Sequence, residues 1–282
     1  MRKRRRRGVT GVIVKERLAR ALEYIGLLKE LRRRASPEAL AGDYVVRGAV
    51  ERYLHLAIEA VIDAGMRLCS LLRLGKPESY RDVARILRGA GMLSAASAGK
   101  LELWVGLRNV LVHGYARIDY GKLAEALGEV EELENIVYEI ARSTENRGVD
   151  PPKAGKDAET IARVLSNRSN VVFAYIFGSR AKGQARCRSD IDVAVYTRGE
   201  ASWKHLVELK NELEDALGLD VDLVHLNEAP LTLAYEVVST GVLVLDRDSE
   251  ARAEYEVKVL KQFLDMKPRL EEYYEELFRQ RE

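Results

Sequence analysis

Two pairs of aspartates in the second half of the chain are spaced like metal-binding carboxylates. Asp190 and Asp192 lie two residues apart in a segment that alternates polar and apolar residues, so both side chains should point to one face of a strand. Asp220 and Asp222 repeat this arrangement in a second segment, which can supply a third carboxylate. Adjacent carboxylates repel unless a cation lies between them, and Mg²⁺ is the cation that carboxylates and substrate phosphates hold together. The pattern therefore predicts a two-metal site for nucleotidyl transfer.

A glycine-serine turn ahead of these aspartates is suited to bind the phosphates of a nucleotide. Gly178 and Ser179 directly follow the apolar run Val171–Phe177. Glycine lets the backbone approach a ligand closely, and Ser179 can offer its amide and its hydroxyl at a helix start, where free N–H groups favour anions. Arg180 and Lys182 lie in the same turn and add positive charge. We expect these four residues to bind the nucleotide.

Strands and helices alternate around these residues. Strands are expected over residues 171–177, 190–196, 220–226 and 242–245. Helices are expected over residues 157–167, 202–217 and from about 249 onward, the last one kinked near Pro268. This order predicts an α/β or α+β domain.

The order and spacing of these pieces resemble the DNA polymerase β nucleotidyltransferase superfamily, whose pattern is Gly-Ser, ten residues, then Asp-x-Asp. The longer run resembles its minimal nucleotidyltransferase (MNT) branch. The matching pieces are Phe177–Gly183, Ser189–Asp192, Val221–Asn227, Tyr255-Glu256 and Asp265. The resemblance implies that Asp190, Asp192 and Asp222 are the catalytic residues and the Mg²⁺ ligands, with ATP as the substrate. It leaves Asp220 outside the site.

A second group of chemically useful residues lies in the first half, at the end of an apolar helix. Asn109 and His113 are four residues apart and share a helix face, and Arg108 lies on the neighbouring stripe. His113 can act as a general acid or base, and Arg108 can bind a phosphate. Because no metal ligands accompany them, these residues suit metal-independent RNA cleavage. Taken alone, they also fit a polar pair at a helix end, with Gly114 as the C-terminal cap.

The rest of the first half has a helical pattern throughout. Apolar residues repeat at spacings of three and four from Val14 to about Arg142, and no segment alternates like a strand. Helices are expected from Val14 onward and over about 43–74, 80–90, 94–112 and 120–143. The pattern predicts a bundle of four or five helices.

This bundle carries a motif similar to that of the HEPN superfamily, Arg-x4-His-x-Tyr. The matching residues are Arg108, His113 and Tyr115, and residues 57–63 are similar to the second helix of the HepT-like (DUF86) branch. The resemblance covers about residues 14–143. It implies an endoribonuclease in which two such motifs pair across a homodimer and together form the cleft that cleaves RNA.

Together, the two resemblances imply a toxin and its antitoxin in one polypeptide. HEPN and MNT proteins are commonly encoded side by side, and the MNT protein transfers AMP from ATP to the tyrosine of the HEPN motif. Here the resemblance implies a protein adenylyltransferase whose AMP acceptor is Tyr115, so that the attached AMP silences the nuclease. Fusion raises the effective concentration of the two halves if the linker lets them meet. It also departs from the usual two-protein arrangement, which leaves open whether the first half still cleaves RNA.

Composition divides the chain in the same way. We expect a basic arm over residues 1–13, a helical domain over 14–146, a linker over 147–156 and a nucleotidyltransferase domain over 157–282. Residues 1–150 contain 27 Lys and Arg against 20 Asp and Glu, a net charge of +7; the remaining residues contain 19 against 24, a net charge of −5. Six of the positive residues form the run Arg2–Arg7, which suits either a solvated tail or an arm for nucleic acid.

The sequence favours a cytoplasmic protein without a membrane segment. Cys69 and Cys187 have no metal-ligand spacing and are expected to stay reduced. No apolar stretch reaches the ~18 residues that a membrane helix needs, and the basic start is not followed by the apolar run of a signal peptide. His225, Trp104 and Trp203 are expected to be packing residues.

Two other functions remain open. The chain could be a small-molecule nucleotidyltransferase, similar to aminoglycoside-modifying enzymes, in which the helical half builds the acceptor pocket. That function leaves Arg108, His113 and Tyr115 without a role. A non-catalytic nucleic-acid-binding protein is supported only by the basic N-terminus. AMP incorporation into the protein itself distinguishes these functions from the self-modifying fusion.

Overall fold

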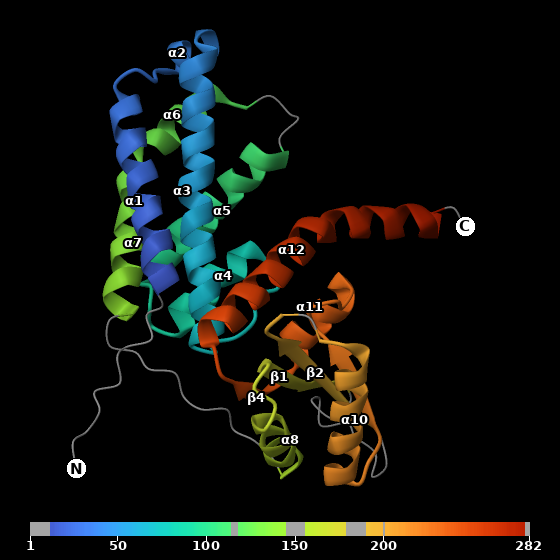
Figure 1. Ribbon diagram of the computed structural model, residues 1–282. Helices are drawn as coiled ribbons and strands as arrows, with labels where there is room; N and C mark the ends of the chain where they lie inside the picture. Colours follow the sequence, from blue (N-terminus) through green and yellow to red (C-terminus); the bar gives the residue numbers. More distant parts are fainter. Residues whose placement is uncertain (1–11, 114–117, 145–155, 179–189, 200, 280–282) are drawn as a thin grey trace, which may run out of the picture. The chain divides into compact units, whose positions relative to one another are not determined.

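The computed structural model describes residues 12–113, 118–144, 156–178, 190–199 and 201–279 (Figure 1). The chain divides into two compact units, residues 1–149 and residues 150–282. Most of the expected basic arm and nearly all of the expected linker lie outside the described residues. None of the described helices combines the length and the apolar character needed to cross a membrane.

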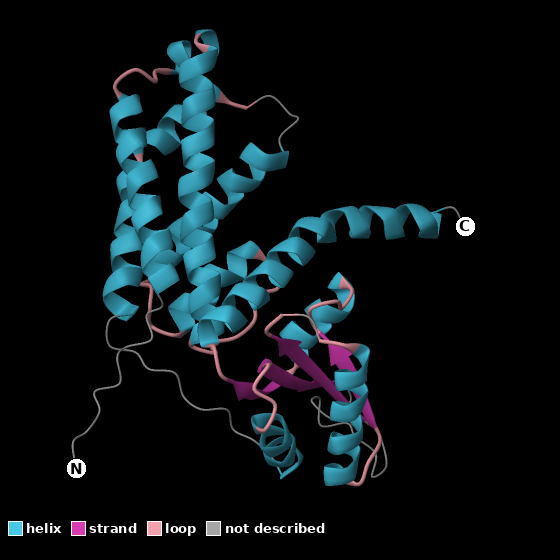
Figure 2. Cartoon of the chain, viewed as in Figure 1, coloured by secondary structure: helices cyan, strands magenta, loops and turns pink. Residues whose placement is uncertain are grey.

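The described part of the first unit consists of helices joined by short turns (Figure 2). They are α1 (Val12–Arg32), α2 (Pro37–Gly42), α3 (Tyr44–Leu71), α4 (Tyr80–Gly89), α5 (Ala95–His113), α6 (Tyr120–Gly128) and α7 (Val130–Thr144). The predicted helical domain is therefore confirmed, but its described residues form seven helices rather than four or five. The short helix α2 was not expected, and the helix expected over 120–143 is broken at Glu129, directly after Gly128.

Helix α3 is the central element of the first unit. It begins after Asp43, whose Oδ1 accepts hydrogen bonds from the backbone N–H groups of Val45 and Val46 at 2.9 and 3.0 Å. From Ala60 to Leu71 every residue of α3 is buried, and α1 lies along it (Figure 1). Because α3 also contacts α4 and α5, its side chains can reach the predicted HEPN motif on α5.

The second unit contains a four-stranded mixed sheet. Its strands are β1 (Val171–Phe177), β2 (Ile191–Thr197), β3 (Val221–His225) and β4 (Val242–Asp246), in the order β3-β2-β1-β4. Strands β2 and β4 pair antiparallel with β1, whereas β2 and β3 are parallel. The predicted domain of interleaved strands and helices is confirmed.

Helices cover both faces of this sheet. Helices α8 (Lys156–Ser166) and α10 (Trp203–Leu217) pack on the face formed by Ile191, Val193 and Val195. Helices α11 (Leu231–Thr240) and α12 (Ser249–Arg279) pack on the opposite face, which contains Phe173, Tyr175 and Ala194. Helix α11 was not expected from the sequence. The C-terminal helix continues through Pro268 as one helix that changes direction along its length (Figure 1).

A buried cluster of charged residues connects α12 to strands β1 and β4 of the sheet. Arg252 is only 1% exposed; its Nε donates to Asp246 Oδ2 at 3.0 Å and its Nη1 to Glu256 Oε1 at 2.9 Å. The hydroxyl of Tyr175 on β1 also donates to Glu256 Oε1. Burial and the neighbouring Glu256 carboxylate raise the pKa of Tyr175 well above its ordinary value, which keeps this phenol protonated as a donor. The cluster therefore pairs its buried charges within the second unit.

Candidate active site

The sheet places Asp192 beside Asp222. Asp192 is paired in parallel register with Asp222 on β3, and on its other side it faces Phe177, the last residue of β1. Because Asp192 alternates with Ile191 and Val193, which belong to the opposite face, its side chain lies on the face that α11 and α12 cover. Two of the three predicted catalytic carboxylates are therefore neighbours at one end of the sheet.

The surroundings of Asp192 disfavour its negative charge. Burial raises the pKa of Asp192 above its ordinary value, and the nearby carboxylates of Asp222, Glu236 and Asp190, in that order, raise it further. A hydrogen bond from the backbone acts in the opposite direction and is the smallest of these effects. A divalent cation would relieve this repulsion, because it would neutralise the charge that the carboxylates share.

Gly178 lies directly against this carboxylate. Its φ of +68° is in the left-handed region, and a β-carbon there would overlap Asp192 Oδ2. The sequence predicts a glycine here because the backbone must approach a ligand. The structure adds a second reason, which is that the Asp192 carboxylate occupies the space of a side chain.

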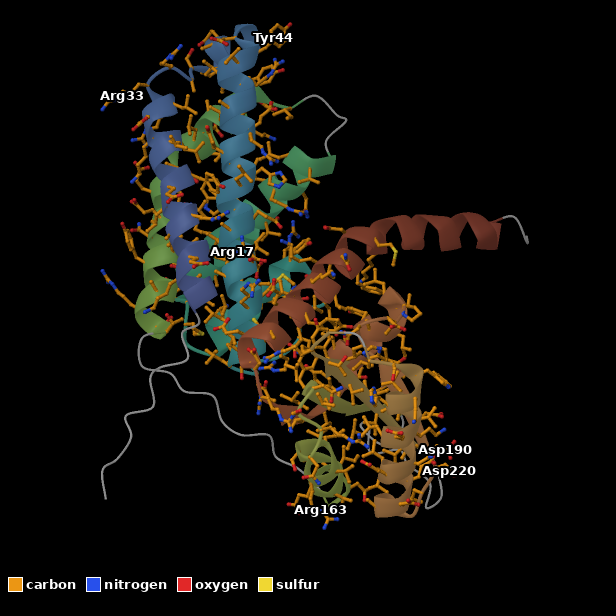
Figure 3. All side chains as sticks on the ribbon, viewed as in Figure 1. Arg17, Arg33, Tyr44, Arg163, Asp190 and Asp220 are labelled. Atoms are coloured by element: carbon orange, nitrogen blue, oxygen red, sulfur yellow. The ribbon has the colours of Figure 1, made fainter. Side chains whose placement is uncertain are left out.

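The third predicted ligand lies just outside the strand. Asp190 is exposed and precedes β2, and Figure 3 labels it beside Asp220. The N–H of Ile191 donates to the carbonyl of Asp220 at 2.9 Å, which links the two strand starts. Among the described residues, no three His, Cys, Asp or Glu side chains are arranged to hold one metal ion. Ser179, Arg180 and Lys182 of the predicted phosphate turn lie outside the described residues.

Sequence analysis missed Glu236. This residue lies on α11, and its charge affects Asp192 more strongly than that of Asp190 does. One signal could have indicated it, since Glu236 is the only charged residue between Leu231 and Thr240. A lone carboxylate in an otherwise uncharged helix is worth testing as part of a polar site.

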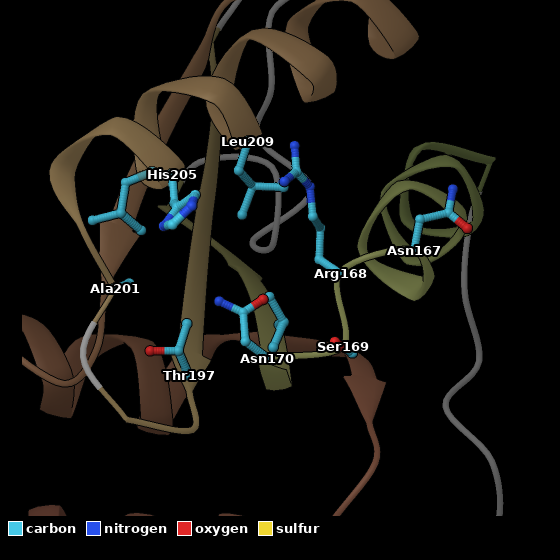
Figure 4. A pocket seen from close by; sticks show the side chains of 10 residues that line it. Asn167, Arg168, Ser169, Asn170, Thr197, Ala201, His205 and Leu209 are labelled. Carbon is cyan, nitrogen blue, oxygen red and sulfur yellow. The ribbon is translucent and has the colours of Figure 1, made fainter.

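A pocket of about 390 Å³ lies at the other end of the strands (Figure 4). It is lined by turn residues between α8 and β1, by Thr197 at the end of β2, and by the first turns of α10, including His205 and Leu209. Strand register separates it from the carboxylates, because Thr197 pairs with Val171 whereas Asp192 pairs with Phe177. The pocket is therefore distinct from the predicted catalytic site.

In the first unit, Arg108 is held by two neighbours. Its side chain is almost completely buried, and its Nε donates to Glu59 Oε2 on α3 at 3.1 Å. Its guanidinium also lies over the ring of Tyr80, the first residue of α4, with the Cζ atom 4.7 Å from the ring centroid. The contacts with Glu59 and Tyr80 fix the position of the guanidinium, the planar group that can bind a phosphate.

The remaining motif residues follow from the course of α5. Asn109 is exposed, and His113 is the last residue of the helix. The side chain of His113 and the whole of Gly114 and Tyr115 lie outside the described residues. Asn109 and position 113 fall on the same stripe of the helix, as the spacing predicts.

Two of the other tyrosines in the first unit differ in how far they are restrained. The hydroxyl of Tyr120, at the start of α6, accepts a hydrogen bond from Arg47 Nη1 at 2.9 Å. Tyr44, which is labelled in Figure 3, is 75% exposed. The Cζ atom of Arg47 lies 4.5 Å from its ring centroid. Tyr120 is therefore restrained through its oxygen, whereas Tyr44 is restrained only through its ring.

The packing roles expected for three residues are mostly confirmed. Trp104 is buried, and the His225 side chain is 7% exposed, with Nε2 2.9 Å from Thr197 Oγ1. The expectation for Trp203 is wrong, because this residue is 80% exposed. It directly follows Ser202, the N-cap of α10, so its ring lies outside the apolar stripe that Leu209 and Leu213 bury.

Comparison with known proteins identifies both units. Residues 159–250 match the family described as polymerase beta, nucleotidyltransferase, and residues 21–140 match the family described as ribonuclease HepT-like. A putative protein adenylyltransferase of Methanocaldococcus jannaschii is 39% identical over 72 residues, which are 26% of this chain and 77% of that protein. Protein adenylyltransferase MntA of Shewanella oneidensis is 40% identical over 81 residues, which are 29% of this chain and 58% of MntA.

The first half also has a similar protein of its own. A putative RNase of Archaeoglobus fulgidus is 25% identical over 108 residues, which are 38% of this chain and 81% of that protein. The chain thus belongs to the polymerase β nucleotidyltransferase family, and it joins this domain to a ribonuclease HepT-like domain in one polypeptide.

Proposed function

We propose that the second half of this chain transfers AMP from ATP to a tyrosine of the first half, and that this modification silences an RNA-cleaving HEPN domain. The observation that carries the proposal is the union of the two domains in one polypeptide, over residues 21–140 and 159–250. Relatives of the second half are a protein adenylyltransferase and a putative protein adenylyltransferase, and a relative of the first half is a putative RNase. The chain would therefore be a toxin fused to its own antitoxin.

The carboxylates fit the Mg²⁺ that this reaction requires. Asp192 and Asp222 lie side by side on parallel strands, and burial together with the Asp222 carboxylate raises the pKa of Asp192, which supports a cation between them. With Asp190, these residues would hold the cation, whose charge offsets that of the nucleotide phosphates when it is bound. Gly178, Ser179, Arg180 and Lys182 would hold the phosphates themselves.

Tyr115 is the proposed AMP acceptor. Its phenol would lose its proton to solvent, and the phenol oxygen would form a bond to the α-phosphorus of ATP. The bond from the α-phosphorus to the oxygen that bridges to the β-phosphate would break, and pyrophosphate would leave. The restraint on the Tyr120 hydroxyl supports this choice, because its oxygen already binds Arg47. AMP on Tyr115 would lie two residues from His113 and would exclude an RNA phosphate by bulk and by charge.

Arg108 and His113 are the proposed catalytic residues of RNA cleavage. Arg108, whose side chain is positioned by Glu59, would bind the scissile phosphate through its guanidinium, and His113 would transfer the proton. A second copy of the chain would complete the cleft. Exposed apolar residues on α5 support such a contact, since Leu103 is 69% exposed and Val110 50% exposed on the helix that carries the motif.

Intact-mass measurement tests the proposal directly. The purified chain, incubated with ATP and Mg²⁺, should gain the mass of one or more AMP groups, and its RNA cleavage should fall in parallel. Chelation of the divalent cation should prevent both changes. A chain that transfers AMP only to an added small molecule would instead support the small-molecule nucleotidyltransferase.

A further inference from the structure

Helix α4 brings a second arginine to the predicted HEPN motif. Tyr80 and Arg81 are its first two residues, and they approach α5 side by side. Tyr80 lies beneath the guanidinium of Arg108. The side chain of Arg81 extends to Gly106. Its Nη2 atom lies 3.5 Å from the position that a β-carbon on residue 106 would occupy.

Gly106 is on the motif face of α5. It precedes Asn109 by three positions and position 113 by seven, so these three positions share one stripe of the helix. Because glycine has no side chain, the guanidinium of Arg81 can lie close to the helix backbone on this stripe. The charge of Arg81 is thus placed at Gly106, on the stripe of α5 that position 113 shares two turns further along the helix.

Arg81 differs from the next arginine of the same helix. Arg85 donates to Asp82 Oδ1 at 3.0 Å and also lies 3.7 Å from Glu102 Oε1, so acidic partners offset its charge. Arg81 is exposed, and in the described part of the chain no carboxylate pairs with it. An exposed, unpaired guanidinium next to a polar site is suited to bind a phosphate.

We propose that Arg81 binds a phosphate of the RNA substrate next to the one that Arg108 binds. This inference rests on the proposed ribonuclease function. Arg81 would add affinity without taking part in the chemical step, because it contributes one more charged contact to the sugar-phosphate backbone.

Binding of a non-cleavable RNA tests this role. The parent and every variant compared with it carry Asp192→Asn, so that the first half stays free of AMP. The intact mass of each protein verifies this. Anisotropy of a fluorescent 2′-O-methyl single-stranded RNA gives the affinity at several salt concentrations. Arg81→Gln should weaken binding about fivefold or more, and should reduce the slope of log affinity against log salt by about 0.7. Arg81→Lys should keep that slope.

Arg85→Gln is the matched control, since it removes the same charge one turn later on α4. It should leave affinity and slope close to those of the parent. An unchanged affinity in Arg81→Gln, an equal loss in both variants, or an altered oligomeric state in Arg81→Gln would overturn the inference. A parent that neither binds nor cleaves RNA would instead overturn the proposed ribonuclease function, and this inference with it.

Discussion

Gly178 and the carboxylate of Asp192 occupy adjoining space, so that residue 178 has no room for a side chain. Gly178→Ala should therefore displace the Asp192 carboxylate, in addition to straining a backbone with φ of +68°. Because misplacing a reacting group by about 1 Å can cost about 100-fold in rate, we expect a loss of that order in AMP transfer. Single-turnover transfer from labelled ATP measures it.

The control for this variant is Gly218→Ala. Gly218 has almost the same φ, +67°, but nothing lies within 4 Å of the position of its β-carbon. It should cost about 1 kcal/mol in folding stability and leave transfer intact. Equal transfer rates in the two variants would show that backbone strain alone, and not the displaced carboxylate, explains the effect.

Asp192→Asn should stabilise the metal-free chain and abolish AMP transfer. Burial and the neighbouring Asp222 raise the pKa of Asp192, so the folded chain holds this proton more tightly than the unfolded chain does. The charged form therefore destabilises the fold above the raised pKa, and this cost disappears as the pH falls toward the ordinary value of 3.8. At neutral pH without divalent cations, the variant should melt about 1–2 °C above the wild type.

Calorimetry across pH and Mg²⁺ concentration checks this prediction. The difference should vanish in acid, and Mg²⁺ should stabilise the wild type but not the variant. Asp220→Asn is the control, since Asp220 contributes its carbonyl to the β2–β3 contact and is not a predicted ligand. Normal transfer by Asp192→Asn would be incompatible with the two-metal site.

Glu256→Gln should destabilise the second unit strongly. The change removes the Glu256 carboxylate from Arg252, which is 1% exposed and also forms an ion pair with Asp246. Because a buried charge is then under-compensated, we expect a loss of about 3 kcal/mol in the free energy of unfolding. Urea denaturation of the second unit measures it. Glu254→Gln, an exposed change on the same helix, should stay within about 0.5 kcal/mol of the wild type.

Local sequence pattern was enough to predict the elements that carry the carboxylates. Asp190 and Asp192 alternate with apolar residues, and that period of two predicted a strand over 190–196, which the structure forms over Ile191–Thr197. The starts of two helices could also be predicted from the sequence, because Asp43 and Ser202 are short polar residues that cap α3 and α10 through their side chains. Such features depend on neighbours in the sequence.

Contacts between distant residues could not be predicted in this way. Glu59 and Arg108 are 49 positions apart, and Tyr80 reaches Arg108 only because α4 packs on α5. Helix α11 was missed because its β-branched residues weaken its helical propensity, and packing on the sheet overrides that preference. Glu236 was missed with it.

Arg108→Lys should abolish most RNA cleavage while preserving the fold. Lysine keeps a positive charge near Glu59, but it lacks the planar group that lies over Tyr80 and the paired terminal nitrogens that would bind a phosphate. We expect cleavage to fall about 100-fold in chain free of AMP. Arg52→Lys, at an exposed position of α3, should cleave normally. Persistent cleavage in both Arg108→Lys and His113→Ala would place the nuclease elsewhere.

The last prediction concerns the acceptor of AMP. Tyr115→Phe should end AMP incorporation, because it removes the phenol oxygen that would attack the α-phosphorus. Tyr120→Phe should still be modified, although loss of the hydrogen bond from Arg47 should cost about 1 kcal/mol in stability. Tyr44→Phe tests the most exposed rival and should also be modified normally. Peptide mapping after reaction with ATP locates the group.

The pattern across the three variants separates the possible functions. Loss of labelling only in Tyr115→Phe would support a modification that acts on the RNA cleft, since residue 115 adjoins position 113 of the motif. Labelling that moves to Tyr44 or Tyr120 would place AMP away from that cleft, and blockage of the nuclease would then need another cause. Undiminished labelling in Tyr115→Phe would refute the assignment. Because no tyrosine of the motif would then be the target, a small-molecule acceptor would become the better explanation of the transferase.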